Sequence, residues 1–311
     1  MNPERGSGRL VDAAMFERAS QFFSQLQDEI CSALAEWDGG AEFRTDGWER
    51  PGGGGGRTRV LAEGRLFEKA GVNVSTVFGE LPEELAGTMP GSGRAFKATG
   101  VSLVLHPQSP LVPTVHANFR FLAKGEAWWF GGGADLTPSY PFRDDVIHFH
   151  RTWRTVCQRH GPPIDYARFK TWCDEYFYLP HRGEARGVGG IFFDYLQGDF
   201  EPLFAFIQDA GRSFLAAYGP IVTRRRDLPW TEEQRRFQEV RRGRYAEFNL
   251  VHDRGTLFGL KTGGRIESVL MSLPPRVRWV YDFQPRPGSP EAELFEYLKP
   301  RDWAAERMST E

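Results

Sequence analysis

The sequence predicts an α+β fold with a largely antiparallel sheet. Two observations lead to this fold class: strand-like segments occur in runs, and helical segments fall between those runs in pairs. The regular alternation of strand and helix that indicates a parallel sheet is absent. No internal repeat and no linker divides the 311 residues, so we expect one domain over residues 1–311.

The N-terminal part is predicted to be a long helix followed by a flexible loop. Apolar residues recur every seven positions, which is the pattern of one apolar helix face. These residues are Phe16, Phe23, Ile30 and Trp37. Gly39 and Gly40 are expected to end the helix. Residues 51–56 are a proline and five glycines, a composition typical of a flexible loop.

Short apolar or β-branched runs bounded by glycine or proline predict the strands of the sheet. They are residues 59–78 with breaks at Gly64 and Gly71, 101–106, 113–122, 128–130 and 190–196. Longer segments that begin or end at glycine or proline predict helices. They are residues 142–160, 165–178, 201–218, 232–242 and 291–298.

The C-terminal part is expected to return to strands. Four short segments rich in aromatic and β-branched residues are separated by tight turns, which predicts an antiparallel meander. They are residues 245–251, 256–260, 266–271 and 277–283.

Composition and missing motifs exclude several classes of function. The net charge is -2, so no general field favours nucleic acid or a membrane surface, and no apolar run approaches the roughly 20 residues of a membrane span. Met1 to Gly8 lacks a signal-peptide pattern, and three scattered cysteines do not form a disulfide framework. We therefore expect a cytoplasmic protein. The nucleotide-binding motifs GxGxxG and GxxxxGK[ST], the nucleophile motif GxSxG and the metal motifs HExxH and CxxC are absent.

The most informative segment is Trp128 to Pro138, in which an aromatic run is followed by three glycines and then by Asp135. Glycines cost backbone entropy, so they suggest a backbone that a flat ligand approaches closely. Asp135 would then lie at the mouth of an apolar slot. The alternative is a strand that ends in a glycine turn and a helix cap.

Alternation along two predicted strands gathers polar side chains on one face of the sheet. His116, Asn118 and Arg120 share one face, and Val115, Ala117, Phe119 and Phe121 share the other. Ser102 and His106 also share a face, so neighbouring strands would combine these residues into a pocket floor. The alternative is a solvated sheet face.

Two glycine-containing turns carry further polar groups. Asp253 and Arg254 precede Gly255, and Gly263 and Gly264 precede Arg265. Backbone N–H groups and an arginine can bind a carboxylate, although exposed arginines in ordinary hairpin turns are the alternative. The histidines are scattered, so they can bind a metal only if the fold gathers them.

Seven long segments, taken together, resemble oxygen-dependent coproporphyrinogen III oxidases. They read GVNVSTVFGELP (71–82), ATGVSLVLHP (98–107), PTVHANFRF (113–121), WWFGGGADLTP (128–138), WCDEYFYLPHR (172–182), GVGGIFFDYL (187–196) and RRGRYAEFNLVHDRGTLFGLKTGGRIESVLMSLPP (241–275). They span most of the chain. Residues 1–56 and the tail after Arg301 match least.

The resemblance implies oxidative decarboxylation of two propionates of coproporphyrinogen III to vinyl groups, as part of haem biosynthesis. Molecular oxygen would be the co-substrate, no organic cofactor would be needed, and protoporphyrinogen IX, carbon dioxide and hydrogen peroxide would be the products. The resemblance also implies that the antiparallel sheet is large and flat, with helices on both faces. It further implies a homodimer with its interface near residues 245–280. A non-catalytic tetrapyrrole carrier that uses the same slot is the alternative.

The resemblance also implies roles for individual residues. Substrate binding would fall to Ser102, Asn118, Phe119, Arg120, Gly263, Gly264 and Arg265. Catalysis would involve His116 as proton donor together with Asp135, Asp253 and Arg254, and we expect Asp135 to accept from the pyrrole N–H groups. A divalent, Mn-type metal would be bound by His106, His116, His150 and His181, although these histidines could instead serve the substrate directly. Gln108, Ser109 and His252 depart from the family pattern.

Overall fold

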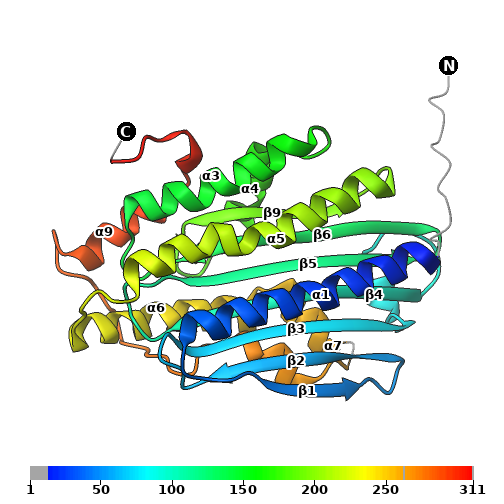
Figure 1. The fold of residues 1–311 in the computed structure, drawn as a ribbon, viewed down its shortest axis with the longest axis horizontal. Helices are drawn as coiled ribbons and strands as arrows, with labels where there is room; N and C mark the ends of the chain where they lie inside the picture. Colours follow the sequence, from blue (N-terminus) through cyan, green and yellow to red (C-terminus); the bar gives the residue numbers. More distant parts are fainter. Residues whose placement is uncertain (1–12, 262, 310–311) are drawn as a thin grey trace.

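A computed structural model describes residues 13–261 and 263–309, so the Met1 to Gly8 segment and Thr262 lie outside the described residues. The main sheet is open and antiparallel, with strand order β1-β2-β3-β4-β5-β6-β9, and β7 and β8 form a small second sheet. Helices lie on both faces of the main sheet (Figure 1). The predicted α+β class is therefore confirmed.

The strands and helices have the following bounds. The strands are β1 (Arg44–Glu49), β2 (Gly54–Ala62), β3 (Phe67–Glu80), β4 (Ala95–Pro107), β5 (Thr114–Lys124), β6 (Ala127–Thr137), β7 (Tyr178–Leu179), β8 (Glu184–Ala185) and β9 (Gly189–Leu196). The helices are α1 (Ala13–Asp38), α2 (Glu83–Ala86), α3 (Arg143–His160), α4 (Tyr166–Tyr176), α5 (Phe200–Arg225), α6 (Glu232–Val251), α7 (Arg254–Lys261), α8 (Ile266–Val269) and α9 (Pro290–Tyr297). Two 3-10 turns, η1 (Leu270–Ser272) and η2 (Trp303–Ala305), complete the chain.

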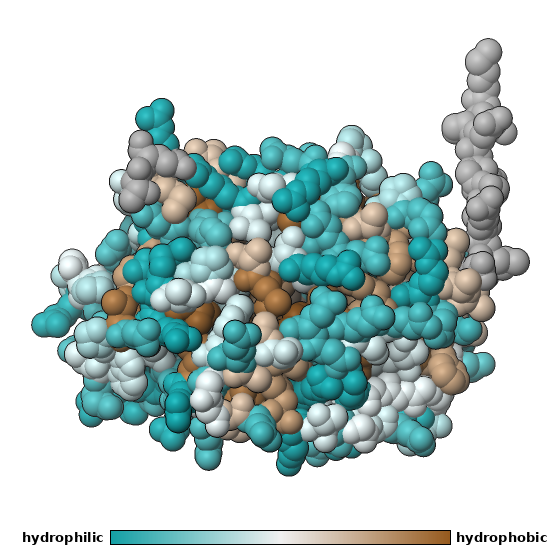
Figure 2. All heavy atoms as spheres, in the orientation of Figure 1, coloured by the Kyte–Doolittle hydropathy of each residue, from teal (hydrophilic) through white to brown (hydrophobic). Residues whose placement is uncertain are grey.

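The main hydrophobic core lies between one face of the sheet and the helices α1, α3 and α5 (Figure 1). On β5 the alternation expected from the sequence is present, because Phe119 and Phe121 are buried on the core face. Phe121 packs against Phe130 with ring centroids 4.8 Å apart, and Phe200 of α5 packs on both rings. Figure 2 shows this side of the molecule, where hydrophilic residues cover the helices and hydrophobic residues lie between them.

The other face of the sheet carries α6, which is held there by a buried charge cluster. A register shift between Phe67 and Lys69 on β3 is a bulge at Glu68, and a bulge redirects a side chain. Glu68 accepts from Arg235 at 2.6 Å and from Arg242 at 2.6 Å, and all three side chains are at most 9% exposed. The bulge thus fixes one face of α6 to the sheet at two points, two helical turns apart.

Three local expectations in the sheet were wrong. Gly54, Gly55 and Gly56 belong to β2, where each pairs with a residue of β3, so residues 51–56 are not a flexible loop throughout. Gly71 does not break a strand, because β3 runs through it. The glycines after Phe130 do not end β6, which continues to Thr137 and pairs with strands on both sides.

The predicted C-terminal meander was also wrong. Residues 245–251 continue α6, the next two segments fall in α7, α8 and η1, and residues 277–283 form neither a strand nor a helix. The aromatic content suggested strands, but Tyr245 and Phe248 both lie against Arg186, as residues three apart on one helix face do. Asp253 then begins α7 by accepting from the backbone N–H of Thr256. In the described part of the chain, no helix is long and apolar enough to cross a membrane.

Candidate active site

The candidate site lies on the sheet face opposite the main core, over β4, β5, β6 and β9. The strand register places Ser102 directly beside Asn118, and His116 directly beside Asp135. His116, Asn118 and Arg120 are half-buried, whereas their neighbours on β5 are buried on the core side. The side chains that alternation assigned to one face therefore do lie together.

A buried relay connects His116 to the interior. Nδ1 of His116 lies 2.8 Å from Oδ1 of Asp135, and Nη2 of Arg186 donates to both oxygens of Asp135 at 2.9 and 2.8 Å. Because a carboxylate only accepts, Nδ1 of His116 carries the proton, and Nε2 is left to exchange a proton with a ligand. The His116 side chain is 21% exposed, so the imidazole is partly accessible from the sheet face.

Asp135 is not at the mouth of a slot, as the sequence had suggested, but is 1% exposed. Burial by itself raises the pKa of Asp135, and the charge of Arg186 and the hydrogen bond from His116 outweigh that effect and lower it. Asp135 is therefore a fixed anion that orients His116. Its two oxygens are already occupied by protein donors.

Arg186 is held by aromatic rings and by one amide. Its guanidinium lies 4.1 Å from the ring centroid of Phe177, 4.4 Å from that of Tyr245 and 4.8 Å from that of Phe248. Nη1 donates to Asn249 of α6 at 2.9 Å. The cation therefore joins α6 to β6 in a site from which water is excluded, where its charge acts strongly on Asp135.

Arg120 lies further along β5 and remains partly accessible. It donates to Oδ1 of Asn118 at 2.8 Å and pairs with Asp194 of β9 at 2.8 Å. Its side chain is 28% exposed. Arg120 is thus a cation that a ligand carboxylate can reach from the sheet face.

The Asp253–Arg254 pair joins this site through Tyr176 of α4. The Tyr176 hydroxyl donates to Asp253 at 2.8 Å, and the Arg254 guanidinium lies 4.9 Å from the Tyr176 ring centroid. Burial and Asp253 raise the pKa of Tyr176, while the charges of Arg254 and Arg120 oppose the rise. The positive charges of both arginines therefore favour the ionised form of Tyr176, which lies at the rim of the site.

The segment Gly263 to Arg265 lies on the same face but over the far edge of the sheet. Arg265 pairs with Asp46 of β1, and Ser268 contacts Thr58 of β2. Three strands separate β1 from β5, so at about 4.8 Å per strand Arg265 lies roughly 19 Å from His116. The N–H of Gly264 already donates to Gly259. This segment is therefore not gathered with His116 and Arg120.

Phe119 is likewise not gathered with the other site residues. It is 1% exposed and packs in the main core on the opposite sheet face. Phe119 belongs to the same strand as His116 and Arg120, but its side chain lies on the opposite face of the sheet.

The four histidines implied as metal ligands do not form a metal site. His150 contacts Tyr166 and the carbonyl of Val188, and His106 contacts Thr114 and the carbonyl of Ser272, so both nitrogens of each ring are engaged. His181 contacts His252 and Glu247 instead. Within residues 13–261 and 263–309, no group of three or more metal-binding side chains is gathered. The donor set therefore does not fit a four-histidine metal.

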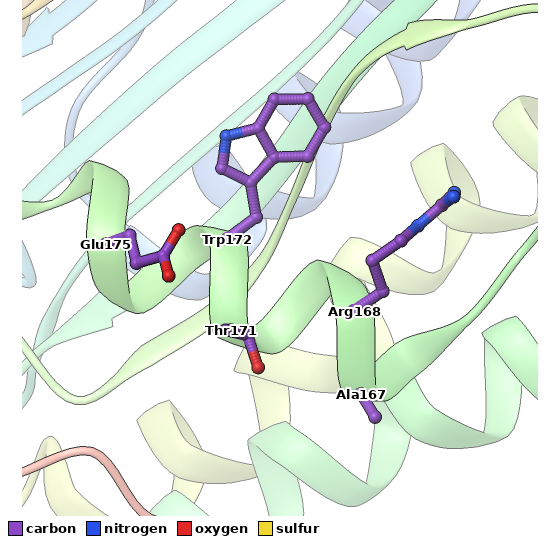
Figure 3. Close-up of a pocket in the computed structure, with 5 residues that line it drawn as sticks. All are labelled: Ala167, Arg168, Thr171, Trp172 and Glu175. Atoms are coloured by element: carbon purple, nitrogen blue, oxygen red, sulfur yellow. The ribbon is translucent and has the colours of Figure 1, made fainter.

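Two surface hollows lie outside the candidate site. Figure 3 shows the first, lined by Ala167, Arg168, Thr171, Trp172 and Glu175, all from α4. The second lies between the strands β1 to β3 and the α8–η1 segment, and its lining includes Asp46, Thr58 and Lys69. Neither hollow is lined by His116, Asp135 or Arg120, so the site is defined by its side chains and not by these hollows.

Sequence reasoning missed two charged residues of this site. Arg186 lies in the loop between β8 and β9, and Asp194 lies near the end of β9. Local spacing does not connect either residue to β5 or β6. The signal that could have found Arg186 is charge balance, because a buried Asp135 requires a buried cation. No comparable signal points to Asp194.

The comparison with protein families agrees with this geometry. The sequence matches the family model described as coproporphyrinogen III oxidase over residues 18–303. The match runs from within α1 to the start of η2 and so includes the whole main sheet and every charged residue of the candidate site. The chain therefore belongs to the coproporphyrinogen III oxidase family.

Proposed function

We propose that this protein converts two propionates of coproporphyrinogen III to vinyl groups with molecular oxygen as the oxidant. The observation that carries this proposal is the sheet face on which His116, backed by Asp135 and Arg186, lies near the accessible cation Arg120. A polyanionic, electron-rich macrocycle needs a proton-exchanging group and a cation for its carboxylates, and this face offers both.

The proposed reaction balances for each propionate. The side chain –CH2–CH2–COO⁻, one O2 and one proton give –CH=CH2, CO2 and H2O2. The C–COO⁻ bond breaks, one hydrogen leaves the carbon beside the ring, and O2 takes up two electrons and two protons. The propionate side chain supplies the two electrons through the C–COO⁻ and C–H bonds that break, and the macrocycle keeps its oxidation state, so no organic cofactor is part of the proposal. The second propionate repeats the sequence.

Within this proposal, Arg120 binds a propionate through charge-assisted hydrogen bonds, with Asn118 and Ser102 beside it. His116 exchanges the proton through Nε2, and Asp135 fixes the tautomer of the ring. Direct contact of Asp135 with the pyrrole N–H groups is not part of the proposal, because both its oxygens accept from His116 and Arg186. Arg265 and the Gly263–Gly264 turn would reach a more distant carboxylate.

We also propose a homodimer in the cytoplasm. Exposed apolar side chains concentrate between residues 250 and 281, which supports a subunit interface there. Cys31, Cys157 and Cys173 are free and buried, which suits a reducing compartment. Binding of nucleic acid is not part of the proposal.

The decisive experiment is incubation of the purified protein with coproporphyrinogen III, with and without air, followed by mass analysis of the products. We expect protoporphyrinogen IX and hydrogen peroxide only in air. Asp135→Ala should lower turnover by at least about a hundredfold, as loss of a group that acts in the transition state does. Arg120→Ala should lower kcat/KM by at least about a hundredfold, mainly by raising KM, because Arg120 binds a propionate. Unchanged substrate in air would favour a tetrapyrrole carrier, and equal conversion without air would exclude oxygen as the oxidant.

A further inference from the structure

We propose that Asp194 is a positioning residue, which fixes the Arg120 guanidinium in the direction from which it binds a substrate carboxylate. This inference rests on the proposed function of Arg120. Asp194 has no role in the family resemblance described above, and it emerges from the local geometry of β9.

A bulge brings Asp194 onto the site face. Phe130 pairs with Leu196 and Gly132 pairs with Phe193, so the single residue Gly131 lies opposite both Asp194 and Tyr195. Such a bulge re-aims a side chain and commonly occurs beside an active site. The backbone of Tyr195 has a φ of 51°, which is rare for a residue other than glycine. The bulge therefore stores strain at the position that contacts Arg120.

Both oxygens of Asp194 are used to hold this geometry. Oδ1 accepts from the backbone N–H of Tyr195 at 3.0 Å, and Oδ2 lies 2.8 Å from Nη2 of Arg120. The carboxylate is 12% exposed, so it has little freedom to turn away. One side chain thus connects the strained backbone of the bulge to the guanidinium.

Gly131 provides the space for this ion pair. A Cβ at Gly131 would lie 2.6 Å from Oδ1 of Asp194 and 2.8 Å from Nε of Arg120, which is closer than atoms can approach. The two side chains therefore lie flat against the bare backbone of β6. This part of the glycine run serves the Arg120–Asp194 pair.

The physical benefit is preorganisation. A long arginine side chain loses rotamer entropy when a ligand fixes it, and a resident partner imposes that loss before the ligand arrives. Asn118 holds Nη1 and Asp194 holds Nη2, so the guanidinium plane is already defined in the free protein. Removal of Asp194 should leave the cation present but free to rotate.

The test is a double-mutant cycle on Arg120 and Asp194. Asp194→Ser retains a hydroxyl acceptor for the Tyr195 N–H but does not reach Arg120, so it separates the Arg120 contact from the stability of the bulge. We expect Asp194→Ser and Asp194→Ala to lower kcat/KM about tenfold, mainly by raising KM. Asp194→Asn keeps one oxygen for Arg120 but turns its amide NH2 toward the Tyr195 N–H, so its kcat/KM should lie between that of Asp194→Ser and that of the wild type.

The cycle itself gives the sharpest outcome. If Asp194 acts through Arg120, then Asp194→Ser should have no further effect in the Arg120→Ala protein. Additive losses, or a normal KM for Asp194→Ser, would overturn the proposal. A kcat/KM for Asp194→Asn no higher than that of Asp194→Ser would overturn it as well, because an acceptor facing Arg120 would then bring no benefit. Asp209→Ala, which removes a carboxylate paired with Arg159 far from the site, is the matched control.

A second readout separates this inference from the proposed function. Oxidised coproporphyrin III carries the same four carboxylates but cannot be oxidised in the proposed way, and its binding can be followed by fluorescence. The same non-additive pattern should appear in its Kd. If the wild-type protein binds it and shows this pattern but converts no coproporphyrinogen, the proposed reaction fails while the role of Asp194 stands.

Discussion

At the scale of single residues, the site is organised by a buried ion pair. Asp135 is 1% exposed and the Arg186 side chain 2% exposed, and each is the main charge partner of the other. Removing one member of such a pair leaves an uncompensated charge in the interior, which costs far more than the pair contributes. The same arrangement keeps Asp135 ionised and thereby keeps His116 in one tautomer. Stability and the proposed role of His116 are therefore coupled at this pair.

Replacement of Arg186 should affect both properties together. Arg186→Met retains the apolar contacts with Phe177 and Phe248 but removes the charge, so we expect unfolding free energy to fall by about 3–5 kcal/mol. The pKa of Asp135 should rise, because burial is then no longer opposed by a cation. Urea denaturation at pH 7 measures the loss. Arg182→Met is the control: Arg182 is 38% exposed in its pair with Glu247, so its loss should cost at most about 1 kcal/mol. Equal losses in the two variants would contradict this account.

Buried histidines predict how stability depends on pH. Burial and the nearby charge of Lys170 lower the pKa of His150 to about 3. In the unfolded chain the pKa is about 6.5, so below that pH the unfolded state binds a proton that the folded state refuses. The contribution of His150 is therefore complete above pH 6.5 and is lost as the pH falls towards 3.

We expect the unfolding free energy to fall by about 1.4 kcal/mol per pH unit for His150 between pH 6 and pH 4, with His106 adding a change in the same direction. His150→Gln retains a donor for the Val188 carbonyl. It should remove the contribution of one bound proton from that slope, which is about 1.4 kcal/mol per pH unit. Urea titrations at several pH values give the slope. Val156→Ala destabilises the same helix without a titrating group and should keep the wild-type slope. An unchanged slope in His150→Gln would refute this assignment.

At the scale of elements, strand alternation was the reliable guide. It predicted which side chains of β5 face the core and which face the site, because a half-buried strand leaves a period of two in its sequence. Partners across the sheet could not be predicted, since nothing in the sequence links Arg186 or Asp194 to residues more than 50 positions away on β6 and β5. Tyr245 and Phe248 suggested a strand because aromatic residues favour strands. In the structure both residues belong to helix α6, where their rings pack against Arg186.

The glycine run of β6 illustrates the same limit. The sequence indicated that another group lies close to the backbone of this run. In the structure that group is the backbone of β9. A Cβ at Gly133 would lie 2.3 Å from the carbonyl oxygen of Ile191 and 3.0 Å from the Cα of Phe192, both in β9. The neighbouring strand therefore occupies the space that a ligand was expected to occupy.

Gly133→Ala should therefore force β6 and β9 apart. We expect it to lower the unfolding free energy by about 1–3 kcal/mol, as overpacking does. We also expect lower activity, because the change displaces Asp135, which lies two positions further along β6. Gly47→Ala is the matched control, because Gly47 lies in β1 and a Cβ there would meet no atom within 4 Å. That variant should be as stable as the wild type or slightly more stable. Thermal denaturation of both proteins compares them, and equal stability would show that β9 yields freely.

At the scale of the whole molecule, the helices on the two faces of the sheet differ in the polarity of the surface that they expose. α1, α3 and α5 turn hydrophilic surfaces outward (Figures 1 and 2). The end of α6, α7, α8 and the segment that follows expose large apolar side chains. These are Leu250, Val251, Leu257, Leu260, Ile266, Trp279, Val280 and Tyr281. Trp279 donates to Glu247 of α6, which ties the last segment to the helix. We therefore place the proposed subunit interface on this apolar surface.

Charge placed on this surface should separate the subunits without unfolding them. Ile266 is 57% exposed and makes little use of its side chain within one subunit, so Ile266→Glu should leave the fold intact. A buried, unpaired carboxylate at an interface costs several kcal/mol, which is enough to shift a micromolar dimer to monomer. Sedimentation velocity at several concentrations measures the assembly. Trp230→Glu, at an exposed apolar residue outside the surface, is the control and should leave the mass unchanged. A protein that stays dimeric with Ile266→Glu would place the interface elsewhere, and a monomeric wild type would remove it from this account. Arg265, at the proposed distant carboxylate site, directly precedes Ile266. Loss of coproporphyrin III affinity on dissociation would therefore connect the interface to that site. Unchanged affinity would show that the two are independent.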